Sequence, residues 1–485
     1  MLPTLLSSLR RHCITLLLLA VLAGSFLTYT NYRQKYIGAV DWYGYFQEAK
    51  LFMAGRLTLP TEFAAADYPA IVPFGFNVTN HGTVVPQYPP GFPLLLAAAG
   101  FVRLEFFVTP LIGVASCLLL FMLVADLTGD RRTALIYALL WAFFPTVVFG
   151  STTMMSDLVA AFFVAASYYA YRRGAQMASA FLLAFALCVR PTNVLYLLVF
   201  SLVLIRDGRL IRYALLMLIP GCLYGLYNYY QYGAPWRTGY FDIRSDLVAE
   251  VFPQHSWFYL KQTALQCGPL VIFFCAWAFR RPKFEKFIFV AWFAAFLLFY
   301  SFWRPGGDRW WWTRFLLPGF IPIFLLSAQG FSEFLKLLEN RLSGIPRQVA
   351  RFCLFAFMVV TPVYYVDFGL KQADLWIRNK GEEYFRLVKE TEQYVSPGSY
   401  VGSVEFAGSF RLYTNLGSFV SVHDNSLNLV PVLIAKHDVY LIVESWNKDN
   451  PIIALLMERY SAVKVREISV WGGVPLYRLT APSTK

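Results

Sequence analysis

Long apolar runs separated by short polar loops fill the first three quarters of the chain. A helix needs about 20 apolar residues to cross a bilayer, and this pattern predicts eleven transmembrane helices. Residues 177–206 form a broken pair, interrupted by Arg190-Pro191-Thr192-Asn193, and each half is short enough to require a short or tilted span. The other nine spans are expected at about 13–31, 108–126, 133–150, 158–171, 211–230, 257–279, 285–303, 315–331 and 352–368.

The stretch between the first two spans is different. Residues 33–92 are polar and rich in Pro, Gly and Asn, which predicts a long external loop. Residues 92–107 are apolar but too short to cross, so we expect them to re-enter or lie along the membrane. Within the loop, residues at helical spacing predict an interfacial amphipathic helix: Trp42, Tyr45, Phe46, Ala49, Phe52 and Met53. Asp41 and Glu48, seven residues apart, fall on one face of that helix.

The composition changes at about residue 370. Short strand-like runs at Val401–Phe406, Phe419–Val422, Val439–Val443 and Pro475–Leu479 alternate with helical segments at 380–395, 427–436 and 451–460. The sequence therefore predicts a mainly α, polytopic membrane protein. We expect a transmembrane domain over 1–369, which includes the loop at 33–92, and a small α/β domain over 370–485.

Composition and charge agree with this topology. The chain is 58% hydrophobic and 15% charged, whereas a soluble domain is about a quarter charged. Its net charge of +13 comes from Lys and Arg in the short loops of one face, as the positive-inside rule predicts. We therefore expect no nucleic-acid partner, a cytoplasmic N-terminus and an extracytoplasmic C-terminal domain, in the inner (plasma) membrane. The loop at 304–314 is the exception, because it carries its cations on the outer face.

Carboxylates gather on the predicted outer face. Asp41 is either the N-cap of its helix or a catalytic base. Asp157 begins the span at 158–171 and is either a cap or a functional residue, because ionisable groups are costly at membrane depth. Glu48 is either the wet face of the helix or a supporting residue. His81 is either a solvated loop residue or part of the site.

Five cations lie at or near the same face, against the positive-inside trend: Arg190, Lys261, Arg304, Arg309 and Arg314. Such side chains can extend toward lipid headgroups, and Arg is also the natural bidentate partner of phosphate. Cations and carboxylates on one side of a membrane are typical of a site that places a base opposite a phosphate leaving group.

This pattern resembles the polytopic GT-C-type glycosyltransferases, most closely the bacterial branch related to protein O-mannosyltransferases and to the aminoarabinose transferase of lipid A. The resemblance covers residues 10–368. Its motifs are Asp41, Tyr88-Pro89-Pro90-Gly91-Phe92-Pro93-Leu94-Leu95, Ser156-Asp157-Leu158, Arg190-Pro191-Thr192 and Arg314-Phe315-Leu316-Leu317-Pro318.

The resemblance implies sugar transfer from a polyprenyl-phosphate donor to a cell-envelope acceptor: a lipid, a glycan or a protein. By this resemblance, Asp41 is the expected general base, and Asp157 is expected to position the acceptor or a metal ion. Arg314, with Lys261 or Arg304, is expected to bind the leaving phosphate. Arg190, Arg309 and Tyr88 complete the expected donor site. Many relatives have two adjacent acidic residues where this chain has Asp41-Trp42, which leaves the need for a divalent metal ion open.

Two other functions compete with this interpretation. A lipid or lipid-linked-sugar flippase would show inverted repeats and ionisable residues near the middle of the membrane, and the sequence shows neither. A non-catalytic membrane scaffold would not need carboxylates and cations clustered on one face.

Overall fold

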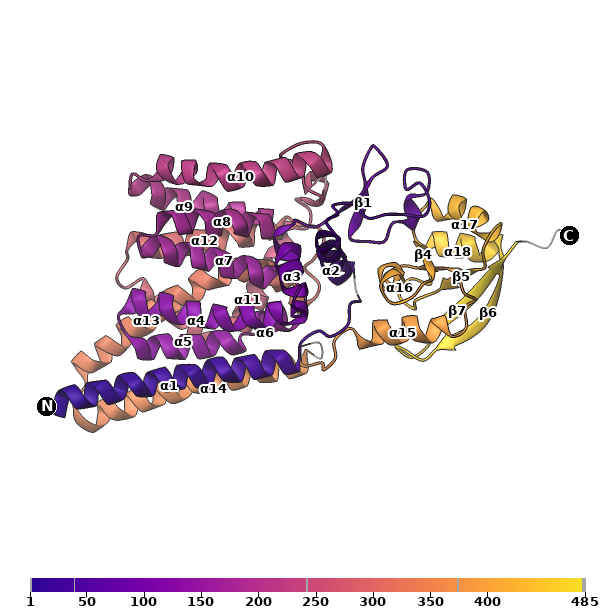
Figure 1. Cartoon of the computed structure of the whole chain (residues 1–485). Helices are drawn as coiled ribbons and strands as arrows, with labels where there is room; N and C mark the ends of the chain where they lie inside the picture. Colours follow the sequence, from indigo (N-terminus) through magenta and orange to yellow (C-terminus); the bar gives the residue numbers. More distant parts are fainter. Residues whose placement is uncertain (1, 39, 241–242, 373–374, 482–485) are drawn as a thin grey trace. The chain divides into compact units, whose positions relative to one another are not determined.

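The structure is a computed structural model that describes residues 2–38, 40–240, 243–372 and 375–481. The chain divides into two compact units. The helical unit comprises Met1–Arg33, Phe107–Tyr224 and Asp242–Arg378, and the mixed unit comprises Gln34–Phe106, Gly225–Phe241 and Asn379–Lys485. Figure 1 labels their elements.

The helical unit is a bundle of apolar helices. They are α1 (Leu2–Asn31), α4 (Val108–Thr128), α5 (Arg131–Phe143), α6 (Pro145–Thr152), α7 (Ser156–Arg172), α8 (Gln176–Val189), α9 (Val194–Arg206), α10 (Leu210–Tyr232), α11 (Phe252–Ala278), α12 (Phe284–Ser301), α13 (Leu317–Arg341) and α14 (Gly344–Lys371). Of these, α10 ends in the mixed unit. Prolines shape two of the helices. Pro145 starts α6 at a 59° bend from α5, and α11 is kinked at Gly268-Pro269, because proline cannot continue the helical hydrogen bonds.

Helix α13 is the centre of the bundle. It packs against α4, α7, α11 and α12 (Figure 1). Phe320, Phe324 and Phe331, spaced along its length, are each 0–1% exposed. A helix whose apolar residues are buried on every side must be surrounded by other helices. Helices α4, α7, α11 and α12 therefore enclose the middle of α13.

The bundle confirms a multi-pass membrane protein. In the part of the chain that the structure describes, six helices are long and apolar enough to cross a membrane, or seven if the bent pair α5 and α6 counts as one span. Helix α3 (Gly91–Gly100) has ten residues, too few to cross, as expected for the segment at 92–107. The broken pair at 177–206 consists of α8 and α9, separated by a short 3-10 turn at Pro191–Asn193. The count of eleven spans stays a prediction.

The mixed unit contains a five-stranded sheet in the order β4-β3-β5-β7-β6. Its strands are β3 (Tyr400–Ser403), β4 (Gly417–Val420), β5 (Val439–Ile442), β6 (Ser461–Ile468) and β7 (Val474–Thr480), and its helices are α15 (Glu382–Glu392), α16 (Ala407–Tyr413), α17 (Ser426–Ile434) and α18 (Pro451–Arg459). Strands β4, β3 and β5 are parallel, and β7 and β6 are antiparallel. The four expected strands are present. Strand β6 was not expected, because it is an exposed edge strand with charged residues such as Lys464 and Arg466.

The first loop adds α2 (Val40–Met53), α3 and a hairpin of β1 (Phe76–Val78) and β2 (Val84–Pro86) to the mixed unit. The expected helix at the start of the loop is therefore present. Its buried residues include Tyr43, Tyr45 and Glu48. The interpretation of Glu48 as the wet face of this helix is wrong, because its side chain is 0% exposed.

A second buried carboxyl lies at the carboxyl ends of the parallel strands. Glu444 follows β5 and is fully buried, and one of its oxygens accepts a hydrogen bond of 3.0 Å from the backbone N–H of Val404, which follows β3. Burial raises the pKa of Glu444 to about 7. Burial outweighs the hydrogen bond from Val404, which by itself favours the ionised form, so the neutral carboxyl is the favoured form below about pH 7.

This burial makes the C-terminal sheet less stable at alkaline pH. A folded pKa of about 7 against an ordinary 4.5 corresponds to on the order of 3 kcal/mol. The stabilising contribution is complete below about pH 4.5 and is lost as the pH rises through 7. We expect the amides of β3 and β5 to lose protection from hydrogen exchange, corrected for intrinsic rates, as the pH rises from 4.5 to about 7. Glu444→Gln should remove that loss, whereas Glu458→Gln, an exposed change on α18, should keep it. Equal pH dependence in all three proteins would contradict this assignment.

Candidate functional site

Of the predicted site carboxylates, Asp157 belongs to the helical unit. It lies in the first turn of α7, and it is 2% exposed. The N-terminus of a helix favours negative charge, but a buried carboxylate also needs a cationic partner. The surrounding loops must supply that partner.

Two arginines supply it. Arg190 follows α8 directly, where Pro191 prevents the helix from continuing, and its guanidinium pairs with Asp157 Oδ1. Arg314 lies in a 3-10 segment, η5 (Trp310–Leu316), and its Nε is 3.7 Å from Asp157 Oδ2. One carboxylate therefore lies between two guanidiniums.

Aromatic rings pack against the guanidinium groups of both arginines. The ring of Phe315 lies 4.9 Å from the guanidinium carbon of Arg190 and 4.9 Å from that of Arg314. Trp311 and Trp312 lie 4.9 and 5.0 Å from that of Arg314. Such contacts attract the cation to the ring face. Because the N–H donors of a guanidinium lie in its plane, the stacked rings leave the in-plane edges to bind oxygen atoms.

An uncharged network that the sequence did not reveal holds η5 in place. Thr146 Oγ1 donates to Gln266 Oε1 at 2.5 Å, and Gln266 Nε2 donates to Thr313 Oγ1 at 2.8 Å. Thr313 Oγ1 in turn donates to the carbonyl of Trp310 at 2.7 Å. These three side chains come from α6, α11 and η5. One feature of the sequence could have indicated this network: polar residues inside apolar spans need hydrogen-bond partners.

Asp41 and Tyr88 form a pair in the mixed unit. Asp41 lies in the first turn of α2, and Tyr88 Oη donates to Asp41 Oδ1 at 2.6 Å. The Tyr88 ring packs 4.4 Å from that of Tyr45. Burial, and then the Asp41 charge, raise the pKa of Tyr88 well above its ordinary value. Tyr88 therefore stays protonated and orients a half-buried carboxylate.

Glu48 plays a different part. Tyr227 Oη donates to Glu48 Oε1 at 3.1 Å, and burial raises the pKa of Glu48 well above its ordinary value. Burial therefore favours the neutral form of the Glu48 carboxyl.

The other predicted residues lie at the surface. The side chains of Lys261, Arg304 and Arg309 are exposed, and Arg309 Nε is 3.9 Å from an exposed Asp308. Among the described residues, no ion pair joins any of these three to Asp157. His81 is exposed in the turn between β1 and β2, where it lines a polar cavity of about 800 Å³ in the mixed unit.

Two expectations stay predictions. Asp41 and Tyr88 belong to the mixed unit and Asp157, Arg190 and Arg314 to the helical unit, so their convergence on one cavity stays a prediction. No three His, Cys, Asp or Glu side chains gather within the described ranges, and Asp157 already faces two arginines. The possible divalent metal ion therefore stays a prediction, and no step is assigned to it.

The fold over nearly the whole chain is shared with solved structures of two glycosyl-transferring enzymes, ArnT and an archaeal oligosaccharyltransferase, as the resemblance in the sequence led us to expect. The crystal structure of ArnT from Cupriavidus metallidurans bound to undecaprenyl phosphate matches with a TM-score of 0.62 and 14% identity, over 96% of this chain and 97% of that one.

A second solved structure supports the same fold. The oligosaccharyltransferase of Archaeoglobus fulgidus in its apo form matches with a TM-score of 0.57 and 12% identity, over 92% of this chain and 73% of that one. No family model and no curated protein sequence matches the chain. At these identities the similarity establishes the fold, and the activity has to be argued from the site.

The cluster around Asp157 should dominate local stability. We expect Asp157→Asn to lower the free energy of unfolding by about 3–5 kcal/mol, because it leaves two largely buried guanidiniums without their shared counter-charge. The control is Asp367→Asn, which removes an exposed pair with Lys371 and should cost at most about 1 kcal/mol. Thermal unfolding in detergent measures both. Equal unfolding temperatures for the two variants would contradict the bridging role of Asp157.

Proposed function

We propose that this protein transfers a sugar from a polyprenyl-phosphate donor to a cell-envelope acceptor at the extracytoplasmic surface of the inner membrane. The observation that carries the proposal is the Arg190–Asp157–Arg314 cluster, which holds two arginines together in a largely buried site. In this orientation the N-terminus is cytoplasmic and the C-terminal sheet is extracytoplasmic. The acceptor is a lipid, a glycan or a protein.

The cluster has the chemistry of a phosphate site. When the bond between the sugar and the phosphate oxygen breaks, the electron pair stays on that oxygen, and the negative charge on the phosphate grows. Arg190 and Arg314 can bind phosphate oxygens through their in-plane N–H groups. Charge that develops in the transition state is stabilised most strongly in a site that excludes water. Asp157 holds the two like charges close together before the donor arrives.

Asp41 is the base in this proposal. The acceptor hydroxyl attacks the anomeric carbon and gives its proton to the Asp41 carboxylate. Tyr88 holds that carboxylate by a 2.6 Å hydrogen bond, which fixes its direction. General-base help of this kind is typically worth 10²–10⁴-fold in rate. The exposed cations Lys261, Arg304 and Arg309 are proposed only as contacts to donor headgroups at the membrane surface.

The solved structures with this fold support the type of donor. One was determined with undecaprenyl phosphate, and the archaeal AglB was determined with dolichol phosphate and an inhibitory peptide. Both ligands are polyprenyl phosphates. The proposal extends this class of lipid to the present chain because its paired arginines suit the phosphate that such lipids share.

Removal of the Asp41 carboxylate should abolish transfer but not membrane insertion. We expect Asp41→Asn to lower the rate at least 100-fold, and Tyr88→Phe to lower it less, because the carboxylate survives without its fixed direction. Asp67→Asn, an exposed change in the same loop, should transfer sugar normally. The measurement is sugar transfer in membranes from a radiolabelled polyprenyl-phosphate donor pool. Normal transfer by Asp41→Asn would exclude Asp41 as the base.

The phosphate role of Arg314 predicts a donor-specific defect. We expect Arg314→Lys to weaken donor binding by at least roughly tenfold, because an ammonium cannot reproduce the bidentate, stacked guanidinium. Arg386→Ala removes one exposed positive charge on α15 and should leave binding unchanged. Titration of both variants with undecaprenyl phosphate compares them. If Arg314→Lys binds as tightly as the wild type, the phosphate lies elsewhere.

A further inference from the structure

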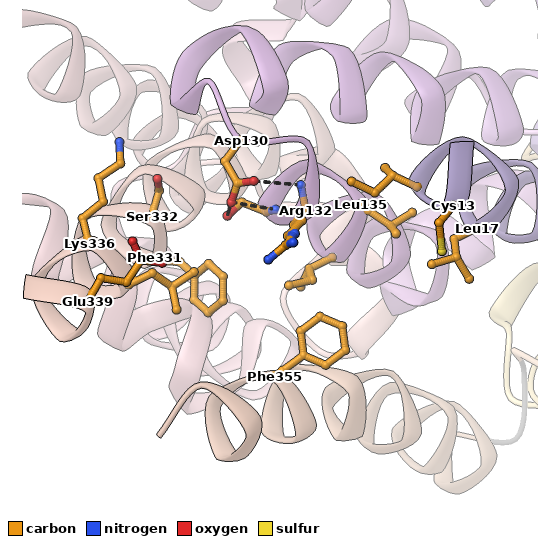
Figure 2. A pocket seen from close by; sticks show the side chains of 14 residues that line it. Cys13, Leu17, Asp130, Arg132, Leu135, Phe331, Ser332, Lys336, Glu339 and Phe355 are labelled. Carbon is orange, nitrogen blue, oxygen red and sulfur yellow. Dashed lines mark hydrogen bonds between the residues drawn. The ribbon is translucent and has the colours of Figure 1, made fainter. Parts of the chain in front are cut away.

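A second cavity lies near the end of α13 that is remote from Arg314. It has a volume of about 670 Å³, and α1, α5, α13 and α14 contribute its walls (Figure 2). Arg314 precedes α13, and Lys336, which lines the cavity, lies near the end of that helix. At 1.5 Å per residue the two are roughly 30 Å apart, which is the thickness of the hydrocarbon core of a bilayer. The cavity and the Asp157 cluster therefore belong to opposite faces of the membrane.

Two cations line this cavity. Arg132 and Lys336 both contribute to its wall, and neither forms an ion pair within the part of the chain that the structure describes. Figure 2 shows Arg132 between Phe331 of α13 and Leu17 of α1. Both residues are exposed, and a guanidinium and an ammonium beside one cavity suit an anionic occupant.

The two carboxylates of the lining do not cancel this preference. Asp130 is engaged at the start of α5, where it accepts hydrogen bonds from the backbone N–H groups of Arg132 and Thr133 at 3.0 and 3.2 Å and from Thr133 Oγ1 at 2.7 Å. Glu339 is exposed on the α13 side of the cavity (Figure 2).

The rest of the wall is apolar and reaches the outside of the bundle. Leu17 is 49% exposed and Phe355 is 52% exposed, so both face the space that lipid occupies. Protein buries little of the helices that carry them: 17% of the most apolar stretch of α1 and 21% of that of α14. An occupant with acyl chains would cover apolar surface on both helices while its headgroup reaches Arg132.

We propose that this cavity binds one glycerophospholipid, with its phosphodiester held by Arg132 and Lys336 and its acyl chains along α1 and α14. Basic pockets between transmembrane helices at the cytoplasmic side suit phospholipid headgroups, and the predicted topology places this end of the bundle there. The lipid attaches α1 and α14 to the bundle. This role is independent of the sugar donor.

Lipid retention by the full-length protein tests the proposal. We expect the wild type, purified in mild detergent and examined by native mass spectrometry, to retain one phospholipid per chain. The double variant Arg132→Ala/Lys336→Ala should retain roughly tenfold less. Arg131→Ala is the matched control, because Arg131 neighbours Arg132 but packs over Phe121 and does not line the cavity. Equal retention by the wild type and the double variant would overturn the proposal.

A cavity-filling variant and a soluble phosphate complete the test. Leu135→Trp fills the cavity without removing a charge and should also lose the lipid. Added phosphatidylglycerol should raise the unfolding temperature of delipidated wild type but not of the double variant, whereas sn-glycerol 3-phosphate should raise neither. Lipid retention by Leu135→Trp, or equal stabilisation by glycerol phosphate, would show that the cavity does not hold a lipid.

Discussion

The buried charge of Asp157 is the constraint on which the helical unit depends. A carboxylate that is 2% exposed is costly unless it is paired. Its partners arrive from two separate places, the end of α8 and the segment η5. The breaks at Pro191 and at η5 are therefore necessary, because continuous helices would not carry Arg190 and Arg314 to the start of α7. The same arrangement gathers positive charge where the proposed chemistry needs it.

Helix α13 joins the two faces of the bundle. At its start, the Thr146–Gln266–Thr313 network holds the segment that carries Arg314. Along its middle, neighbouring helices enclose it on every side. At its far end, the packing loosens toward α1 and α14, and a cavity with two cations takes the place of a packed core. One face thus suits the phosphate of a reacting lipid, and the other suits the phosphate of a structural lipid.

The sequence predicted what depends on local pattern. The apolar runs located the helices, and the charged residues at the outer ends of spans included Asp157, Arg190 and Arg314. Which charges pair depends on tertiary packing. From the sequence alone, Lys261, Arg304 and Arg309 were therefore as good candidates for the donor site as Arg190 and Arg314, but in the structure these three are exposed. For the same reason the sequence could not exclude an exposed position for Glu48, because the hydroxyl that bonds to its carboxyl comes from Tyr227, far along the chain. Gln266 carried no charge and no motif, so its one signal was that it is a polar residue inside an apolar span.

The proposed activity moves a sugar from a polyprenyl phosphate to an envelope acceptor. Mass spectrometry of envelope lipids and glycans, in cells with and without the gene, is its direct test. Deletion should remove one sugar residue from a glycan, lipid or protein of the envelope, and the polyprenyl-phosphate sugar should accumulate. Identical spectra from both strains, with no accumulated donor, would contradict it.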